Sequence, residues 1–353
     1  MKRLFAFLCL LCTLAVLAVG SAEDYGSDIC MQVFMQNAVN GIPTILYTGI
    51  TKTGLSMRSQ PDRESEPKGV LNEHATVQIF GFDQTWLYCW DDNVGVYYLI
   101  RQTVDEITKV RADAPAYGVI PNHYVATMAV DTALYAEPNK DSEAIFECAA
   151  GSRISFWLIR DGWAVVPYRR LIGYVFLGDL ANLEPVAPSV EYAKPGDIIS
   201  VFTTFYSVKN TELNIGRMEN IRVGCSYINN VYQPGQEFNF NQIAGPYRRN
   251  RGYMPSPVLV DGDTVAGYGG GTCQVSTTLY NALLQLGSGI NIIWRRPHGP
   301  SGASYAPHGV DAAVGAQNLN LIFQDAFDFP IEIDSTAMNG ALCICIRKAD
   351  ALN

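Results

Sequence analysis

The residues Gly267 to Ala282, with the sequence GYGGGTCQVSTTLYNA, decide the fold of the C-terminal part of this 353-residue chain. Three consecutive glycines, Gly269, Gly270 and Gly271, let the backbone take positive φ angles and approach a neighbouring chain or a ligand closely. Directly after them, apolar residues recur at helical spacing: Val275, Leu279, Ala282, Leu283 and Leu286. This spacing predicts a glycine-rich loop that runs straight into a buried helix.

Cys273 falls in the first turn of this predicted helix. Unpaired N–H groups and the positive end of the helix dipole favour a thiolate over a thiol at that position. The position therefore suits a reactive cysteine, whereas a free cysteine can equally be a small buried residue with no chemistry. We take Cys273 as the candidate nucleophile and keep the second interpretation open.

The same stretch is part of a longer pattern. Pro234 to Asn241 (PGQEFNFN) precede it, and it is followed by His298, Tyr305, Pro307, Gly309, Asp311 and Ala312. In this order, over roughly residues 200–348, the chain resembles the VanW-like family of cell-envelope proteins. The resemblance implies that family's fold and an extracytoplasmic location, and it implies no particular reaction.

The N-terminus has the features of a secretory signal peptide. Lys2 and Arg3 are followed by an apolar run from Leu4 to Val19 and by small residues that end at Ala22, which predicts a signal at residues 1–22. An uncleaved anchor is the alternative, because the apolar run is only slightly short of a membrane span. We expect a secreted or cell-wall-associated protein, with membrane contact only through such an anchor.

The composition limits the partners and the chemistry. The chain has a formal net charge of −9 and no basic stripe, so nucleic acid is not an expected partner. With 48% hydrophobic residues in 353, it can form more than one core, which predicts a multidomain protein.

The cysteines are few and match no metal template. Two of the nine, Cys9 and Cys12, lie in the predicted signal, and the odd number that remains leaves at least one thiol free. Cys343-Ile344-Cys345 offers only two ligands to a zinc ion. We expect no metal site and no cofactor.

Residues 45–105 and 120–184 show one pattern twice. In each, short runs of valine, isoleucine and aromatic residues alternate with turn formers, which is typical of short strands. Leucine, proline, tryptophan, glycine and tyrosine landmarks recur at an offset of about 77 residues: Leu55, Pro61, Trp86, Gly95 and Tyr97 correspond to Leu134, Pro138, Trp163, Gly173 and Tyr174. Both units resemble bacterial SH3-like domains, which are small all-β barrels that often hold cell-wall material in exported proteins.

Two shorter segments flank these units. An N-terminal segment at residues 23–44 precedes them, and a proline-rich linker at residues 185–197 follows them. The aromatic residues of the two units either stack on wall glycan or stem peptide, or form the cores: Trp86, Tyr88, Trp90, Trp163, Tyr168 and Tyr174.

Residues 198–350 predict an α+β domain. A β-rich run from Ile198, a helical pattern from Glu212 to Asn230, and a hairpin turning at Asp261-Gly262-Asp263 lead into the Cys273 helix. Further strand patterns follow to the C-terminus. This order predicts two helices lying on an antiparallel sheet.

Cys273, His298 and Asp311 form the candidate catalytic set, because a thiol nucleophile needs a base and a third group that orients the base. The alternative interpretation gives these residues no catalytic role. His298 is then a loop residue whose pKa the neighbouring Arg295 and Arg296 would hold down, and Asp311 is a turn residue. We expect substrate contacts from the glycine loop, from polar residues of the helix start and from the later loop: Gly269, Gly270, Gly271, Gln274, Ser276, Thr277, Arg295, Arg296 and Tyr305.

Three hypotheses for function remain. The first is a peptidoglycan-acting cysteine enzyme that cuts or transfers a stem-peptide amide through an acyl-thioester. The second is a non-catalytic peptidoglycan-binding module in which the glycine loop and Arg295 or Arg296 hold a stem carboxylate. The third is glycan-strand cleavage by a carboxylic acid such as Asp311 or Glu237, with Cys273 structural.

Overall fold

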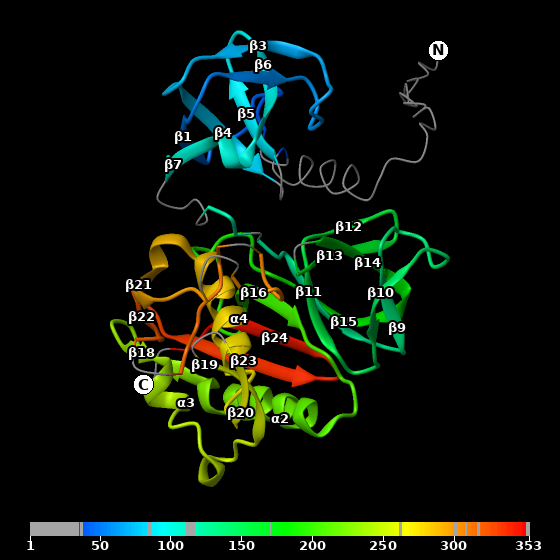
Figure 1. The fold of residues 1–353 in the computed structure, drawn as a ribbon, viewed down its shortest axis with the longest axis vertical. Helices are drawn as coiled ribbons and strands as arrows, with labels where there is room; N and C mark the ends of the chain where they lie inside the picture. Colours follow the sequence, from blue (N-terminus) through cyan, green and yellow to red (C-terminus); the bar gives the residue numbers. More distant parts are fainter. Residues whose placement is uncertain are drawn as a thin grey trace, which may run out of the picture.

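A computed structural model of the protein describes residues 35, 38–82, 86–110, 117–119, 121–169, 171–260, 263–298, 302–307, 309–315 and 318–350. The signal peptide predicted at residues 1–22 and most of the segment at 23–44 lie outside these residues. The described chain is mostly β, with several antiparallel sheets and few helices (Figure 1). None of the helices in these ranges is long and apolar enough to cross a membrane.

The first β-rich unit is one seven-stranded sheet with the order β3-β2-β6-β5-β4-β1-β7. Its strands are β1 (Tyr47–Thr51), β2 (Leu55–Arg58), β3 (Pro67–Leu71), β4 (Thr76–Phe82), β5 (Trp86–Asp91), β6 (Gly95–Ile100) and β7 (Val104–Lys109), with a 3-10 turn η1 (Arg101–Thr103) before the last. Ile79, Leu87, Cys89 and Leu99 are almost fully buried between these strands.

The second unit repeats these elements in order. Its strands are β8 (Tyr124–Met128), β9 (Thr132–Tyr135), β10 (Ala144–Cys148), β11 (Arg153–Phe156), β12 (Leu158–Arg160), β13 (Trp163–Tyr168), β14 (Leu171–Phe176) and β15 (Leu180–Pro185), with η2 (Leu177–Asp179) before the last. β1 begins at Tyr47 and β8 at Tyr124, and β5 begins at Trp86 and β13 at Trp163, so both pairs lie 77 residues apart. The repeat found in the sequence is therefore a repeat of strands.

Neither unit closes into a barrel within the described residues. In the first unit, β3 and β7 are the two open ends of the strand order. In the second unit the equivalent of β4 is interrupted at Trp157, whose N–H pairs with the carbonyl of Val165 at 2.9 Å. The strands then divide into two sheets, β10-β9-β14-β13-β12 and β11-β8-β15. The antiparallel all-β character is confirmed, and the SH3-like barrel remains a prediction.

Apolar clusters connect the units. Phe80, Trp86 and Tyr88 of the first unit share a buried cluster with Trp157 and Tyr174 of the second. Of the six aromatic residues weighed as ligand platforms, four are buried and two are partly exposed: Trp86, Tyr88, Tyr168 and Tyr174 in the first group, Trp90 and Trp163 in the second. Most of these rings therefore stabilise the fold and are not available for stacking on a ligand.

The C-terminal domain contains three sheets and two long helices. The main sheet has the order β16-β24-β23-β17, a second sheet β18-β22-β21, and a hairpin β19-β20. The strands are β16 (Ile198–Phe205), β17 (Asn230–Tyr232), β18 (Glu237–Asn239), β19 (Pro255–Val260), β20 (Asp263–Tyr268), β21 (Ile290–Arg295), β22 (Leu321–Asp325), β23 (Ile331–Met338) and β24 (Ala341–Lys348). The helices are α2 (Glu212–Ile228), α3 (Phe240–Ala244) and α4 (Thr272–Leu284), with the short turns η3 (Arg249–Arg251) and η4 (Gly287–Gly289).

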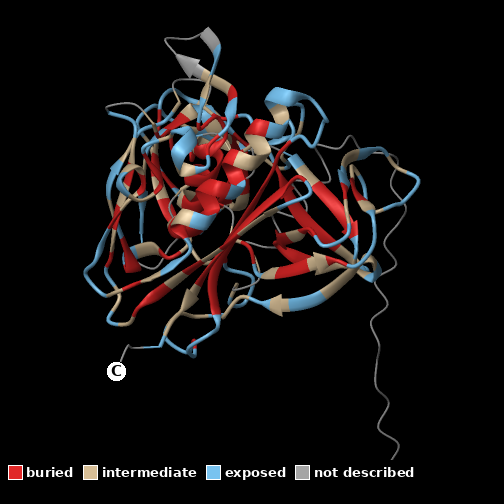
Figure 2. Ribbon diagram, turned by 90° about the horizontal axis from the view of Figure 1, so that it is seen from below, coloured by how far each residue is buried: buried red, intermediate tan, exposed pale blue. Residues whose placement is uncertain are grey.

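α2 and α4 lie side by side on the main sheet, which agrees with the expected α+β layout. α2 contacts β23, and α4 contacts β16 and β24. The apolar face read from the sequence is buried, with Val275, Leu279 and Ala282 fully covered. Buried residues are concentrated in these helices and in the strands beneath them (Figure 2). α4 is therefore held rigidly, and its first turn is a fixed position for a functional side chain.

The second unit also packs on the C-terminal domain. Phe205 of β16 lies against the rings of Phe146 and Tyr168, with centroid distances of 5.1 and 5.3 Å. Arg153 of β11 donates to Asp334 of β23 at 2.8 Å. The two parts of the chain are joined by apolar and charged contacts as well as by the linker.

Candidate functional site

The glycine loop is tightly packed against the protein's own chain. Gly269 and Gly271 have φ angles of +85° and +109°, which only glycine adopts without strain. A Cβ atom on Gly270 would lie 2.2 Å from the carbonyl oxygen of Pro257, and one on Gly271 would lie 3.0 Å from that of Arg217. All three glycines are buried. The close approach that the sequence predicts is therefore made by the protein's own β19 and α2. No contact in the described part of the chain supports the prediction that these glycines bind substrate.

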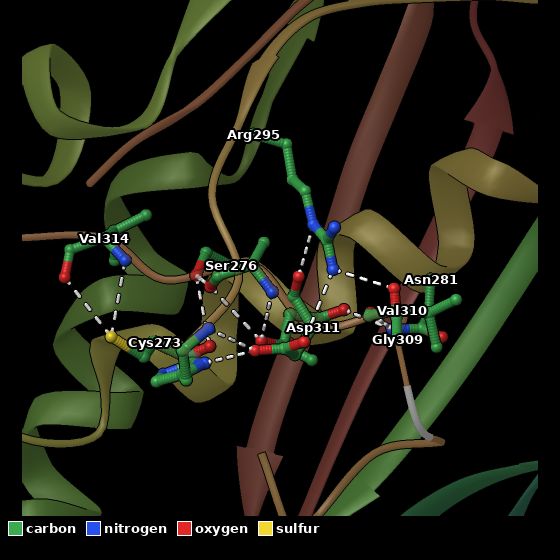
Figure 3. Close-up of polar contacts among 11 residues, drawn as sticks. Cys273, Ser276, Asn281, Arg295, Gly309, Val310, Asp311 and Val314 are labelled. Carbon is green, nitrogen blue, oxygen red and sulfur yellow. Dashed lines mark hydrogen bonds and ion pairs between the residues drawn. The ribbon is translucent and has the colours of Figure 1, made fainter. Parts of the chain in front are cut away.

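Cys273 lies in the first turn of α4 and is partly exposed. Its thiol donates to the carbonyl of Val314 at 3.2 Å, and the N–H of Val314 approaches the sulfur at 3.4 Å (Figure 3). The other described cysteines are buried and form no disulfide among themselves: Cys89, Cys148, Cys225, Cys343 and Cys345. Cys273 is the thiol among them that solvent reaches.

Asp311 and His298 meet beside this helix. The Asp311 carboxylate is 1% exposed, and its Oδ2 lies 2.6 Å from His298 Nδ1 and accepts the His298 backbone N–H at 2.7 Å. Arg295 donates from Nε to the Asp311 carbonyl at 2.6 Å and lies 3.3 Å from Oδ1. These contacts fix the imidazole ring, which is 22% exposed.

The electrostatics of the pair favour a charged ring. Burial lowers the pKa of His298, but hydrogen bonds with Asp311 and with the Cys273 side chain outweigh it and raise the pKa to about 9. Because Asp311 occupies Nδ1, Nε2 is the nitrogen left to face the sulfur. The alternative interpretation of His298 as a loop residue, with a pKa lowered by the neighbouring arginines, does not agree with this raised pKa, and Arg295 is paired with the Asp311 carboxylate.

Asp311 itself stays ionised. Burial raises the pKa of its carboxyl, while the hydrogen bonds from His298 and the charges of His298 and Arg295 hold it below the ordinary value. An ionised aspartate on Nδ1 keeps a histidine in the orientation and protonation state that a cysteine nucleophile requires. The three residues named from the sequence are therefore brought together in the order sulfur, imidazole, carboxylate.

Polar residues of α4 hold the loop that carries Asp311. Ser276 Oγ donates to the carbonyl of Ala312 at 2.6 Å, and Thr277 Oγ1 accepts the Ala312 N–H at 3.0 Å. Asn281 donates to the carbonyl of Val310 at 2.8 Å. Ser276 and Thr277, expected to contact substrate, thus position the site, and Asn281 was missed. A signal was available, because Thr277 and Asn281 are polar residues four apart and therefore lie on the same side of the helix.

The remaining predicted contact residues divide into buried and accessible ones. Gln274 is buried, donates to Thr204 and Phe205 at 3.0 Å each, and accepts from Arg217 at 2.6 Å. Its hydrogen bonds join α4 to α2 and β16. Arg296, in contrast, is exposed, with its guanidinium 5.0 Å from the centre of the Trp294 ring.

Tyr305 lies against the imidazole of His298. The two rings are perpendicular, with 6.4 Å between their centroids. For metals, no cluster of three or more His, Cys, Asp or Glu side chains occurs among the described residues.

The comparisons with known proteins bear on this part of the chain. Residues 216–347 match the family model described as VanW like protein. Residues 216–347 of the chain therefore resemble a VanW-like domain. The match contains most of α2, all of α4 and the residues Cys273, His298 and Asp311, and it does not extend to the units at 45–184.

A relative and two solved structures complete the comparison. The uncharacterized protein YoaR of Bacillus subtilis (strain 168) is 35% identical over 153 residues, which is 43% of this chain and 48% of YoaR. The match thus spans about half the length of this relative. NlpC1 and NlpC2 from Trichomonas vaginalis align at 12% and 11% identity over 86% and 88% of this chain and 93% and 99% of theirs, each with a TM-score of 0.17. A score this low carries no argument about the VanW-like domain.

Proposed function

We propose that the protein is an exported cell-envelope enzyme whose VanW-like domain cuts or transfers an amide of the peptidoglycan stem peptide. The observation that carries the proposal is that the His298 ring joins two groups: its Nδ1 lies 2.6 Å from the buried Asp311 carboxylate, and the ring hydrogen-bonds with the accessible Cys273 side chain at the first turn of α4. A nucleophile, a base and an orienting group within hydrogen-bond reach define covalent cysteine catalysis on many unrelated folds.

The chemistry follows from these positions. Cys273 reacts as the thiolate, after its proton has passed to His298 Nε2. The sulfur attacks the amide carbonyl carbon, and a C–S bond forms as the carbonyl π electrons move to oxygen. When the intermediate collapses, the C–N bond breaks and the amine leaves with the proton held on His298 Nε2. Water or an acceptor amine then attacks the thioester carbonyl carbon, and His298 takes its proton. The C–S bond breaks as this second intermediate collapses, and the Cys273 sulfur leaves as the thiolate. Water gives hydrolysis and an amine gives transpeptidation.

The electrostatics support the role of His298 as the proton donor to the amine. With a pKa raised to about 9, the ring is protonated at neutral pH. A leaving amine needs such a proton, because an unprotonated amide nitrogen is a poor leaving group.

Glycan cleavage by Asp311 is disfavoured by the same geometry. A lytic acid must hold a proton to give to the glycosidic oxygen. Asp311 is buried against Arg295 and His298, and its pKa lies below the ordinary value, so the carboxyl is ionised at neutral pH. The other carboxyl considered, Glu237, lies on β18 in a different sheet from the main one.

Binding of a stem carboxylate by Arg295 is also disfavoured, because this guanidinium is already engaged by Asp311 and Gly309. We infer that the two β-rich units keep the protein at the wall, where a stem-peptide enzyme has its substrate. The secretory pattern at residues 1–22 supports export.

Isolated sacculi incubated with the wild-type protein and with Cys273→Ala test the proposal. Mass spectrometry of the released material should show a new amine and a new acid, or a rearranged cross-link, and Cys273→Ala should give none. The matched control is Cys148→Ala, which removes a buried thiol in the second unit and should leave the products unchanged. Anhydro sugars would identify glycan cleavage instead, and retention on sacculi without products would identify a binding module.

A further inference from the structure

The hydroxyl of Tyr305 is a buried polar group with no partner. Its oxygen is covered by the protein and makes no hydrogen bond of standard geometry to any described residue. Such groups are rare in folded proteins, and they are found where a ligand or reacting group supplies the missing partner. Tyr305 belongs to the short described segment 302–307, and its ring is fixed by the perpendicular contact with His298.

The ring contact with His298 places Tyr305 beside the candidate site, and the charges that act on its hydroxyl agree with this position. Burial raises the pKa of Tyr305, the charge of Cys273 raises it further, and the positive charge of Arg217 lowers it. The Thr277 side chain also lowers this pKa, but the Tyr305 oxygen makes no hydrogen bond of standard geometry with Thr277 or with any other described residue. We therefore treat the Tyr305 O–H as free to donate to a ligand.

A second free donor lies at the first turn of α4, in the residue that carries the nucleophile. Cys273 is the second residue of α4, and the N–H groups on either side of it are engaged, Thr272 with Gly269 at 3.1 Å and Gln274 with Gly271 at 2.9 Å. The Cys273 N–H makes no backbone hydrogen bond within the described chain. N–H groups in the first turn of a helix point out of its N-terminal end and favour negative charge there.

We propose that the Tyr305 hydroxyl and the Cys273 backbone N–H form the oxyanion-binding site for acyl transfer to Cys273. The inference rests on the proposed function and adds a catalytic residue to it. When the sulfur bonds to the carbonyl carbon, the oxygen gains the π electron pair and accepts both hydrogen bonds. When the tetrahedral intermediate collapses, the pair returns to the C–O bond and both donors are released. The bound carbonyl group also supplies the partner that the Tyr305 hydroxyl lacks in the free protein.

Donors that are held in place before the reaction stabilise the developing charge most strongly, because the site does not have to rearrange. Tyr305 is held by His298 and by its buried surroundings, and Cys273 by a fully packed helix. Loss of one such donor lowers the rate of acyl transfer by about 100-fold to 1,000-fold.

The experiment uses the full-length protein, the variant Tyr305→Phe, and two small probes that both react at Cys273. Acylation by p-nitrophenyl acetate passes through an oxyanion and releases p-nitrophenol, which is followed by its absorbance. Alkylation by iodoacetamide displaces iodide and forms no oxyanion. Cys273→Ala gives the background rate for each probe.

We expect Tyr305→Phe to lower the acylation rate by about 100-fold and to leave the alkylation rate within about twofold, because the phenylalanine ring still contacts His298. Tyr247→Phe is the matched control. Tyr247 also senses the charge of Cys273, but its hydroxyl already donates to Asn241 at 2.7 Å, so both rates should stay close to wild type.

Each result has one meaning. An unchanged acylation rate in Tyr305→Phe overturns the assignment, and an equal fall of both rates shows that Tyr305 only positions His298, which also overturns it. The failure of the proposed function looks different, because wild-type Cys273 would then react with iodoacetamide no faster than a denatured control.

Discussion

Replacement of Asp311 by asparagine isolates the contribution of the buried carboxylate to the reactivity of Cys273. In the wild type, Oδ2 accepts two N–H groups of His298, and Oδ1 faces Arg295 at 3.3 Å. An asparagine has one oxygen and one NH2 group. If its oxygen faces His298, the NH2 group meets the Arg295 donor. If it is flipped, the NH2 group meets His298 and forces the ring into the other tautomer.

The magnitude follows from the pKa of His298, which lies at about 9 compared with an ordinary 6.5. This interval corresponds to about 3 kcal/mol in favour of the charged ring. Asp311 is the first of the groups that raise the pKa, and Cys273 supplies the rest. If Asp311 supplies between one third and all of this energy, Asp311→Asn should slow the reaction of Cys273 by about 6-fold to 300-fold.

The assay is the second-order rate of iodoacetamide alkylation at pH 7, with thermal unfolding measured in parallel. Asp334→Asn is the matched control, because Asp334 is also paired with arginines, Arg153 and Arg347, at the junction with the second unit. It should be destabilised without slower alkylation. Full reactivity of Asp311→Asn in folded protein would refute the proposed role of the carboxylate.

Three further outcomes are expected. The rate of amide cleavage should fall above about pH 9, as the imidazolium of His298 is lost. The stability that this ring contributes should be present below pH 6.5 and disappear as the pH rises through about 9. A cleavage rate and a free energy of unfolding that stay constant from pH 7 to 10 would contradict these two expectations. Gly270→Ala should lower the free energy of unfolding, measured by urea titration, by about 3 kcal/mol, because its Cβ would meet the Pro257 carbonyl oxygen at 2.2 Å. Gly54→Ala is the control and should lower it far less, because its Cβ would lie 3.6 Å from the Leu71 carbonyl oxygen. Thr277→Val should cost about 1–3 kcal/mol and slow alkylation of Cys273, since the buried Ala312 N–H loses its acceptor; an unchanged melting temperature would argue against this anchoring.

Much of the local structure could be predicted because it depends on neighbours in the sequence. The glycines, the helix after them and the repeat of strands at a 77-residue interval all follow from spacing along the chain. The closure of the β-rich units could not be predicted in the same way. It depends on which edge strands pair, and a single interruption at Trp157 divides one strand into two sheets.

By itself, the sequence determined the candidate residues of the site, because a thiol at a helix start followed by a histidine and an aspartate is a pattern that chemistry restricts. Only the tertiary structure decided what each residue does. It paired Arg295 with Asp311, used Ser276 and Thr277 to hold the loop at Ala312, and covered the glycines with β19 and α2. The physical reason is that hydrogen-bond partners and burial depend on contacts between segments far apart in the chain. They set the pKa of His298 and leave the hydroxyl of Tyr305 unpaired, and neither property can be read from the order of the residues.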